Sequence, residues 1–176
     1  MYKCYQDKIV PGTDSFSLSW IIGENLLYLI TWVLAGYLIW PIWTPFGLPL
    51  LTVIWAVLVV VVQILLKKHN CSGCYYYDKL YHFGWGKISS AMFKQDSGDP
   101  NVGMKFALFY IVPPPVIFVT ALIFAIIKSP VWVYWFILVL FIILNVASFP
   151  ARKKGCSLCT MREACPGSAA KSKQTN

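Results

Sequence analysis

Four long apolar segments limit the folds that this chain can adopt. They are Leu18–Trp40, Gly47–Leu66, Phe106–Ile127 and Val131–Phe149. A helix needs about 20 apolar residues to cross a hydrocarbon core of about 30 Å, and each segment is close to that length. Only 12% of the residues are charged, against about a quarter in soluble domains. The sequence therefore predicts an all-α integral membrane protein with four transmembrane helices, because buried core helices of a soluble protein need more polar surface around them.

Lysine and arginine are distributed unevenly between the two ends of these predicted helices. Fourteen of the fifteen lie in residues 1–17, 67–105 and 150–176, and Lys128 is alone in the links on the other side. Positively charged loops stay on the cytoplasmic side of a membrane. The first residues also lack the short apolar core of a secretory signal peptide. We therefore expect a protein of the plasma membrane with both termini and the long loop in the cytosol.

The chain also contains an internal repeat. KKHNCSGC, residues 67–74, follows the second apolar segment, and RKKGCSLC, residues 152–159, follows the fourth. Each half is therefore helix, tight turn, helix, basic pair and C-S-x-C, which predicts two hairpins related by a pseudo-twofold axis along the membrane normal. The resulting division is an N-terminal segment 1–17, a first hairpin 18–66, a cytosolic loop 67–105, a second hairpin 106–149 and a tail 150–176 with a disordered end.

Two C-x2-C pairs, Cys71 with Cys74 and Cys156 with Cys159, are candidate metal ligands. Structural disulfides are rare in the cytosol, where this spacing is more typical of metal binding or catalysis. Four thiolates around one ion form the closed tetrahedral site of structural zinc, and neighbouring basic residues favour the thiolate form. We therefore predict a zinc site that forms a small cytosolic cap and clamps the two hairpins together.

Cys165 makes a second kind of metal site possible. The tail reads C-x2-C-x5-C-P, and its three thiols with one from the loop would complete the four ligands of a [4Fe–4S] cluster. The ferredoxin run C-x2-C-x2-C-x3-C-P is absent, because Arg162 occupies its third cysteine position. Free thiols without metal, or a redox-active pair, are further alternatives.

Few other titratable side chains point to a site. His69 and His82 are additional candidate ligands, and His69 is preferred because it directly precedes the first cysteine pair. Asp78 and His82 are spaced to form an acid–base pair on a helix. Glu24 is the only acidic residue in an apolar segment, and we expect it to reach the interface or to pair with a lysine. No established catalytic motif is present, which favours a protein that is not an enzyme.

Pro113–Pro115 interrupts the third apolar segment. Because three consecutive N–H groups are missing, we expect a helix from about Phe106 with a break near Val112. A break is tolerated as a simple kink, but discontinuous membrane helices also form binding sites. A small solute or soft-metal transporter is therefore one alternative. The absence of Cys and His from the apolar segments argues against the transport of soft metal ions.

The long loop is basic and aromatic. Trp85, Ile88 and Met92 recur at helical spacing, which predicts a short amphipathic helix on the membrane surface. We expect its partners to be the lipid bilayer and anionic headgroups rather than nucleic acid, and Tyr75–Tyr77 to pack over the metal site. The favoured function is a structural or accessory membrane component whose capped face binds a protein partner or another copy of the chain. The main alternative is an iron–sulfur electron-transfer protein.

Overall fold

The computed structural model describes residues 1–165 and 167–171, and this part of the chain is helical without a β-strand. Its helices are α1 (Lys3–Gln6), α2 (Leu18–Ile39), η1 (Pro45–Gly47), α3 (Leu50–Leu66), η2 (Lys67–Cys71), α4 (Trp85–Met92), α5 (Pro100–Ala107), η3 (Leu108–Tyr110), α6 (Pro113–Lys128) and α7 (Trp132–Leu158). The predicted disorder at the end of the tail falls in part on residues 172–176, which lie outside the described residues.

Four helical stretches are long and apolar enough to cross a membrane. They are Leu18–Ile39, Leu50–Cys71, Pro100–Lys128 and Trp132–Leu158. Large apolar side chains such as Val57, Ile126 and Phe136 are exposed along them, as expected where the neighbour is lipid rather than water. The prediction of an all-α protein with four membrane-spanning helices is thus confirmed.

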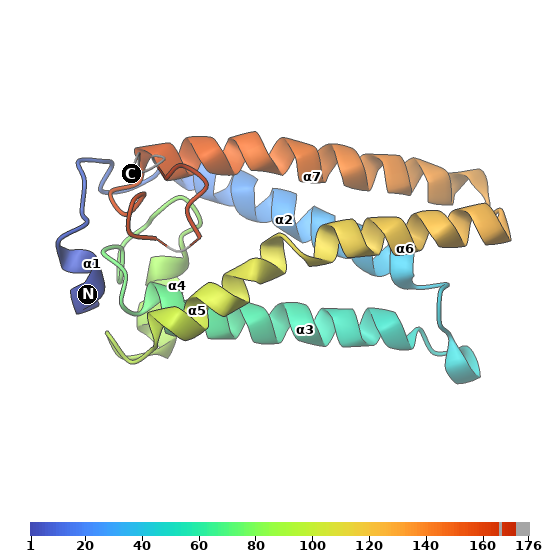
Figure 1. Cartoon of the computed structure of the whole chain (residues 1–176), viewed down its shortest axis with the longest axis horizontal. Helices are drawn as coiled ribbons and strands as arrows, with labels where there is room; N and C mark the ends of the chain where they lie inside the picture. Colours follow the sequence, from blue (N-terminus) through green and yellow to red (C-terminus); the bar gives the residue numbers. More distant parts are fainter. Residues whose placement is uncertain (166, 172–176) are drawn as a thin grey trace, which may run out of the picture.

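The four spans lie side by side along the long axis of the molecule (Figure 1). Helix α2 contacts α3, α6 and α7, α6 contacts α7, and α3 contacts α5. These pairs are compatible with two hairpins around a twofold axis, because the α2–α7 contact has its counterpart in the α3–α5 contact. The duplication of the hairpin itself stays a prediction.

The core of the bundle is built from alanine, larger aliphatic and aromatic side chains. Ala35, Ala121 and Ala125 are almost fully buried, and small residues of this kind allow membrane helices to approach closely. The Tyr134 hydroxyl is also buried and donates a hydrogen bond of 2.8 Å to the carbonyl oxygen of Leu38. This bond joins α7 to α2 in the half of the bundle away from the cysteines.

The third span is broken where the prolines predicted. Helix α5 is followed by the short η3, and α6 begins at Pro113 after a break at Ile111 and Val112. The span starts earlier than the expected Phe106, because Asp99 caps it by accepting a hydrogen bond of 2.8 Å from the Asn101 N–H. Pro100 then occupies the first helical turn, where no N–H is needed.

Helix α7 is longer than the apolar segment that predicted it. It continues through Pro150 to Leu158, so that Cys156 lies in its last turn. A proline inside a helix costs about 3 kcal/mol, and the packing of α7 along α2 offsets this cost. The second cysteine pair therefore begins on a helix rather than in a separate loop.

One end of the bundle carries all the larger connecting segments. The chain termini, α1 and α4 lie together there (Figure 1). Backbone hydrogen bonds join the N-terminal segment to both cysteine regions, from Tyr2 N–H to Gly73 C=O at 3.0 Å and from Thr13 N–H to Leu158 C=O at 2.8 Å. The predicted amphipathic helix exists as α4, but its Trp85 is buried against the protein.

Replacement of Tyr134 by phenylalanine tests the packing of the bundle. We expect Tyr134→Phe to lower the free energy of unfolding by about 0.5–1.5 kcal/mol, because the bond to Leu38 is lost without replacement by water. Chemical unfolding in detergent micelles, followed by circular dichroism, measures this change. The control is Tyr37→Phe, at an exposed tyrosine of α2. Equal effects of the two substitutions would contradict the assignment of a stabilising bond to Tyr134.

Candidate metal centre

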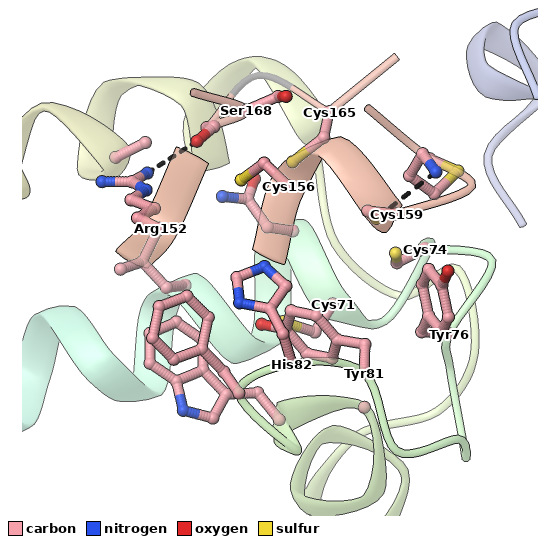
Figure 2. Close-up of a pocket in the computed structure, with 18 of the residues that line it drawn as sticks. Cys71, Cys74, Tyr76, Tyr81, His82, Arg152, Cys156, Cys159, Cys165 and Ser168 are labelled. Atoms are coloured by element: carbon pink, nitrogen blue, oxygen red, sulfur yellow. Dashed lines mark hydrogen bonds between the residues drawn. The ribbon is translucent and has the colours of Figure 1, made fainter. Parts of the chain in front are cut away.

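Five of the six cysteines line a single cavity of about 100 Å³. They are Cys71, Cys74, Cys156, Cys159 and Cys165. Their side chains come from the end of η2, the residues after it, the end of α7 and the tail, and they surround one space in Figure 2. Cys4 is exposed and does not line the cavity. The structure thus brings together all four predicted thiols and the additional one.

Local folding of the chain places these thiols. The basic residues after α3 continue the helix as the π-helical turn η2, which ends at the buried Cys71. Cys159 is the C-cap of α7 and has an extended backbone that ends the helix. A backbone hydrogen bond of 2.7 Å from Cys165 N–H to Met161 C=O then folds the tail back over the cavity.

Four of the sulfur atoms accept hydrogen bonds from backbone N–H groups. The Met161 N–H donates to Cys159 Sγ over 3.4 Å, and the N–H groups of Tyr76, Gly167 and Ala169 donate to Cys74, Cys165 and Cys156. For Cys74, Cys159 and Cys165 the donor lies two residues after the cysteine. Because N–H dipoles stabilise negative charge on sulfur, these turns are suited to hold thiolates.

Without a bound cation four of the five cavity thiols favour the neutral form, and Cys156 is the exception, because its hydrogen bond to His82 outweighs burial and lowers its pKa. Burial raises the pKa of Cys74 well above its usual value and that of Cys159 to about 11, and the backbone N–H bonds only partly offset this effect. Burial likewise raises the pKa of Cys165. Thiols of this kind lose their protons at neutral pH when a bound metal ion takes the place of those protons. Burial and N–H donors together therefore favour metal binding over permanently free thiolates.

The thiols surround the cavity without converging on one point. Within residues 1–165 and 167–171, no three Cys, His, Asp or Glu side chains lie close enough together to hold one metal ion. A tetrahedral zinc site needs four sulfur atoms at about 2.3 Å from a common centre. The geometry therefore gives no support to the predicted zinc site. The positions of Cys156 on the helix and Cys159 beyond its end explain why this pair does not form a compact knuckle.

His82, and not the preferred His69, lies at the cavity. Its Nδ1 is 2.6 Å from Glu24 Oε2, and both side chains are buried. Burial lowers the pKa of His82, but hydrogen bonds to Cys156 and Glu24 outweigh burial and raise it above the usual value. Glu24 thus pairs with a histidine rather than with a lysine. His69 instead accepts a hydrogen bond of 3.0 Å from the Asp99 N–H.

Asp78 and His82, whose spacing could have made an acid–base pair on a helix, are not paired in the structure. The Asp78 carboxylate lies 2.9 Å from Lys87 Nζ and accepts a further hydrogen bond from Ser90. Asp78 itself has a positive φ of 63°, so the chain turns between the two residues. The helical spacing on which the prediction relied does not exist there, because α4 begins only at Trp85.

Aromatic and basic side chains complete the walls of the cavity. Tyr76 is fully buried and lines it, as expected for the run of three tyrosines, and the Tyr81 hydroxyl lies 3.9 Å from Cys71 Sγ. Arg152 and Arg162 also line the cavity. Arg152 donates a hydrogen bond of 2.6 Å to the Gly167 carbonyl. Two guanidinium groups beside five thiols offset the negative charge that metal binding would leave on the sulfur atoms.

The N-terminal segment covers the cavity from outside, which the sequence did not reveal. Tyr2 packs against Gly73, between the first two cavity cysteines, and its hydroxyl donates a hydrogen bond of 3.1 Å to the His69 carbonyl. A side chain on Gly73 would overlap the Tyr2 ring. Residues 1–17 show neither a helical repeat of apolar residues nor a spacing typical of metal ligands. Only the three-dimensional contacts therefore show that this segment covers the cavity.

A methyl group on Gly73 tests whether the N-terminal segment closes the cavity. We expect Gly73→Ala to displace Tyr2 at a cost of about 1–2 kcal/mol, which corresponds to about 5–30-fold easier opening. Alkylation rates of the cavity thiols, measured residue by residue by mass spectrometry, should rise by that factor. The control is Gly23→Ala, where an added methyl group meets no atom within 4 Å. Unchanged rates in Gly73→Ala would refute the covering role.

Comparison with protein families, with curated proteins and with solved structures found no match for this chain. The chemistry of the thiol-lined cavity and its place at one end of a membrane-spanning bundle are therefore the grounds on which a function can be argued.

Proposed function

We propose that this protein is a membrane-bound electron carrier that holds a [4Fe–4S] cluster in the thiol-lined cavity. The observation that carries the proposal is that five thiols surround one enclosed space while no three of them converge on a point. A cubane cluster occupies the space between its four cysteine ligands, whereas a zinc ion needs them in contact with one atom. The arrangement of the thiols therefore favours the cluster over the zinc ion.

The hydrogen bonds to sulfur indicate which cysteines are ligands. Cys74, Cys156, Cys159 and Cys165 each accept a backbone N–H bond, and such bonds stabilise cluster ligands and raise the reduction potential. We assign these four as ligands. Cys71, whose sulfur lies 3.9 Å from the Tyr81 hydroxyl, is then a neighbour of the cluster and not a ligand.

The charged groups at the cavity support the same assignment. A cluster with four thiolate ligands carries net negative charge, which is costly to bury without compensation. Arg152 and Arg162 supply positive charge directly at the cavity wall. Positive charge and backbone donors both stabilise the reduced cluster, as an electron carrier requires.

The predicted orientation of the bundle in the membrane indicates which side the cluster would face. The cysteines that line the cavity belong to η2, the loop after it, the end of α7 and the tail. These segments lie at the end of the bundle that carries α1 and α4 (Figure 1), and fourteen of the fifteen Lys and Arg belong to the segments predicted on this side. Because basic segments stay in the cytosol, the cluster would face the cytosol at the plasma membrane. There it can receive electrons from soluble proteins, and the same face is where a protein partner would bind.

One observation favours a second candidate function, in which Cys156 is a reactive nucleophile. His82 is hydrogen-bonded both to Cys156 and to Glu24. A thiol, a histidine and an orienting carboxylate form the arrangement that activates cysteine in many enzymes. This candidate requires a metal-free cavity in which Cys156 alone is alkylated rapidly at neutral pH. The metal content of the purified protein therefore distinguishes this nucleophile candidate from the electron carrier. It also distinguishes a structural zinc protein from both.

Anaerobic purification with metal analysis tests the proposed cluster. We expect about four iron and four acid-labile sulfide atoms per chain and a broad visible absorption that bleaches on reduction. The single substitutions Cys74→Ser, Cys156→Ser, Cys159→Ser and Cys165→Ser should each abolish this absorption. Cys71→Ser should retain it.

The matched control for this series is Cys4→Ser, because Cys4 is exposed and lies outside the cavity. It should retain the full iron content. One zinc and no iron per chain would refute the electron carrier in favour of structural zinc, and a metal-free protein with a rapidly alkylated Cys156 would refute it in favour of the nucleophile.

Labelling of Cys4 tests the orientation. A membrane-impermeant maleimide should modify this exposed thiol only after intact cells are permeabilised, because we place the N-terminus in the cytosol. The control is Thr44→Cys in a Cys4→Ser background, since Thr44 is exposed in the link at the opposite end of the bundle. This thiol should react in intact cells. The reverse pattern would show that the cavity faces outward.

A further inference from the structure

A second and larger cavity lies within the membrane-spanning part of the bundle. Its volume is about 530 Å³, and residues from α2, α3, the third span and α7 line it. Six of the residues that line it also line the thiol cavity. They are Tyr28, Ala107, Tyr110, Arg152, Gly167 and Ser168. The two cavities therefore share a wall, made largely of two tyrosines and one arginine.

The break in the third span opens this cavity. All three residues of η3, with Ile111 and Pro114, line it. A continuous helix would place side chains at regular intervals along this wall, whereas the break turns the backbone aside between α5 and α6. Helix α2 runs without a break through the other repeat. The triple proline thus does more than bend the third span, because the break that it causes leaves space for the second cavity on one side of the bundle.

The walls of the second cavity combine flat aromatic surfaces with a few polar groups. Trp55 stacks on Phe109 with ring centroids 5.3 Å apart, and Trp32 lies beside Tyr110 at 6.4 Å. The Tyr110 hydroxyl accepts a hydrogen bond of 2.6 Å from Gln63, which leaves its own hydrogen available to an acceptor. The other polar side chains are few and include Asn145, Ser148 and Arg152.

We propose that this cavity binds the ring of a lipid-soluble quinone. Its volume falls within the range of about 300–1000 Å³ that is typical of small-ligand pockets. A flat ring stacks on aromatic side chains, and quinone carbonyl oxygens accept hydrogen bonds from groups such as the Tyr110 hydroxyl. Its position within the membrane-spanning helices favours a ligand dissolved in the bilayer over a water-soluble metabolite. A phospholipid acyl chain would offer no acceptor to the hydrogen of the Tyr110 hydroxyl.

The redox role of this ligand, though not its binding, rests on the proposed cluster. A quinone that gains two electrons and two protons forms two O–H bonds and becomes a quinol. Each electron would come from the reduced cluster across the shared wall, and a soluble one-electron donor protein would reduce the cluster again after each transfer. The protons would come from water at the basic end of the bundle.

Tryptophan fluorescence tests the binding without reference to the cluster, because Trp32 and Trp55 line the cavity. The probe is decylubiquinone, added to the purified protein in detergent. We expect saturable quenching that weakens at least about tenfold in Ser148→Phe, whose larger side chain fills the cavity. The control Val146→Phe places the same side chain at an exposed position of α7 and should bind like the wild type.

A second variant and a second readout keep the test decisive. Circular dichroism must show that Ser148→Phe is folded. If it is not, Asn145→Leu replaces it, since this change removes a polar group from the cavity wall with a side chain of similar shape, and it should likewise weaken the quenching. In protein reduced with dithionite, decylubiquinone should restore the visible absorption of the oxidised cluster, and the cavity variant should slow this step by a similar factor.

Each outcome has one meaning. Three results would overturn the quinone site: quenching that does not saturate, equal binding by the two phenylalanine variants, and a co-purified phospholipid that quinone does not displace. None of them would contradict the proposed iron–sulfur cluster. Saturable, variant-sensitive quenching in a chain without iron would support the quinone site and refute the cluster.

Discussion

The burial of five thiols around one cavity is the constraint on which the rest of the structure depends. A thiol buried in a largely apolar cavity stays protonated and inert unless a cation replaces its proton. The backbone turns after Cys74, Cys159 and Cys165 present N–H groups to sulfur, and two arginines line the same wall. These groups are all arranged to stabilise negative charge on sulfur. Burial nevertheless raises the pKa of Cys74, Cys159 and Cys165, whereas for Cys156 the hydrogen bond to His82 outweighs burial and lowers the pKa. The cavity is therefore suited to the positively charged group proposed for it.

The long apolar helices and the thiol-lined cavity at their end depend on each other. Helices α3 and α7 carry the two cysteine regions to one end of the bundle, so the separation of the thiols follows from helix packing rather than from a short loop. The N-terminal segment then closes the outside, while Tyr28, Tyr110 and Arg152 close the side that faces the bundle. This second wall also bounds the cavity made by the broken third span. A cofactor in the cap and a ligand in the membrane would thus be separated by only a few side chains.

The sequence predicted what depends on local pattern and missed what depends on distant contacts. Apolar length identified the four spans, Pro113–Pro115 located the break, and the repeated C-S-x-C motif identified the thiols that share a cavity. The choice of His69 over His82 failed because proximity to Cys71 along the chain says nothing about which histidine the loop folds inward. The partner of His82 is Glu24, 58 residues away. Tyr2 carries no recognisable motif, and its role follows only from its contact with Gly73.

X-ray absorption spectroscopy of the anaerobically purified protein tests the central claim most directly, because it reports the metal and its neighbours together. The account predicts an iron edge with sulfur neighbours and an additional iron–iron scattering shell, as in a [4Fe–4S] cluster. A zinc edge with four sulfur neighbours and no metal–metal shell, or the absence of bound metal, would contradict it.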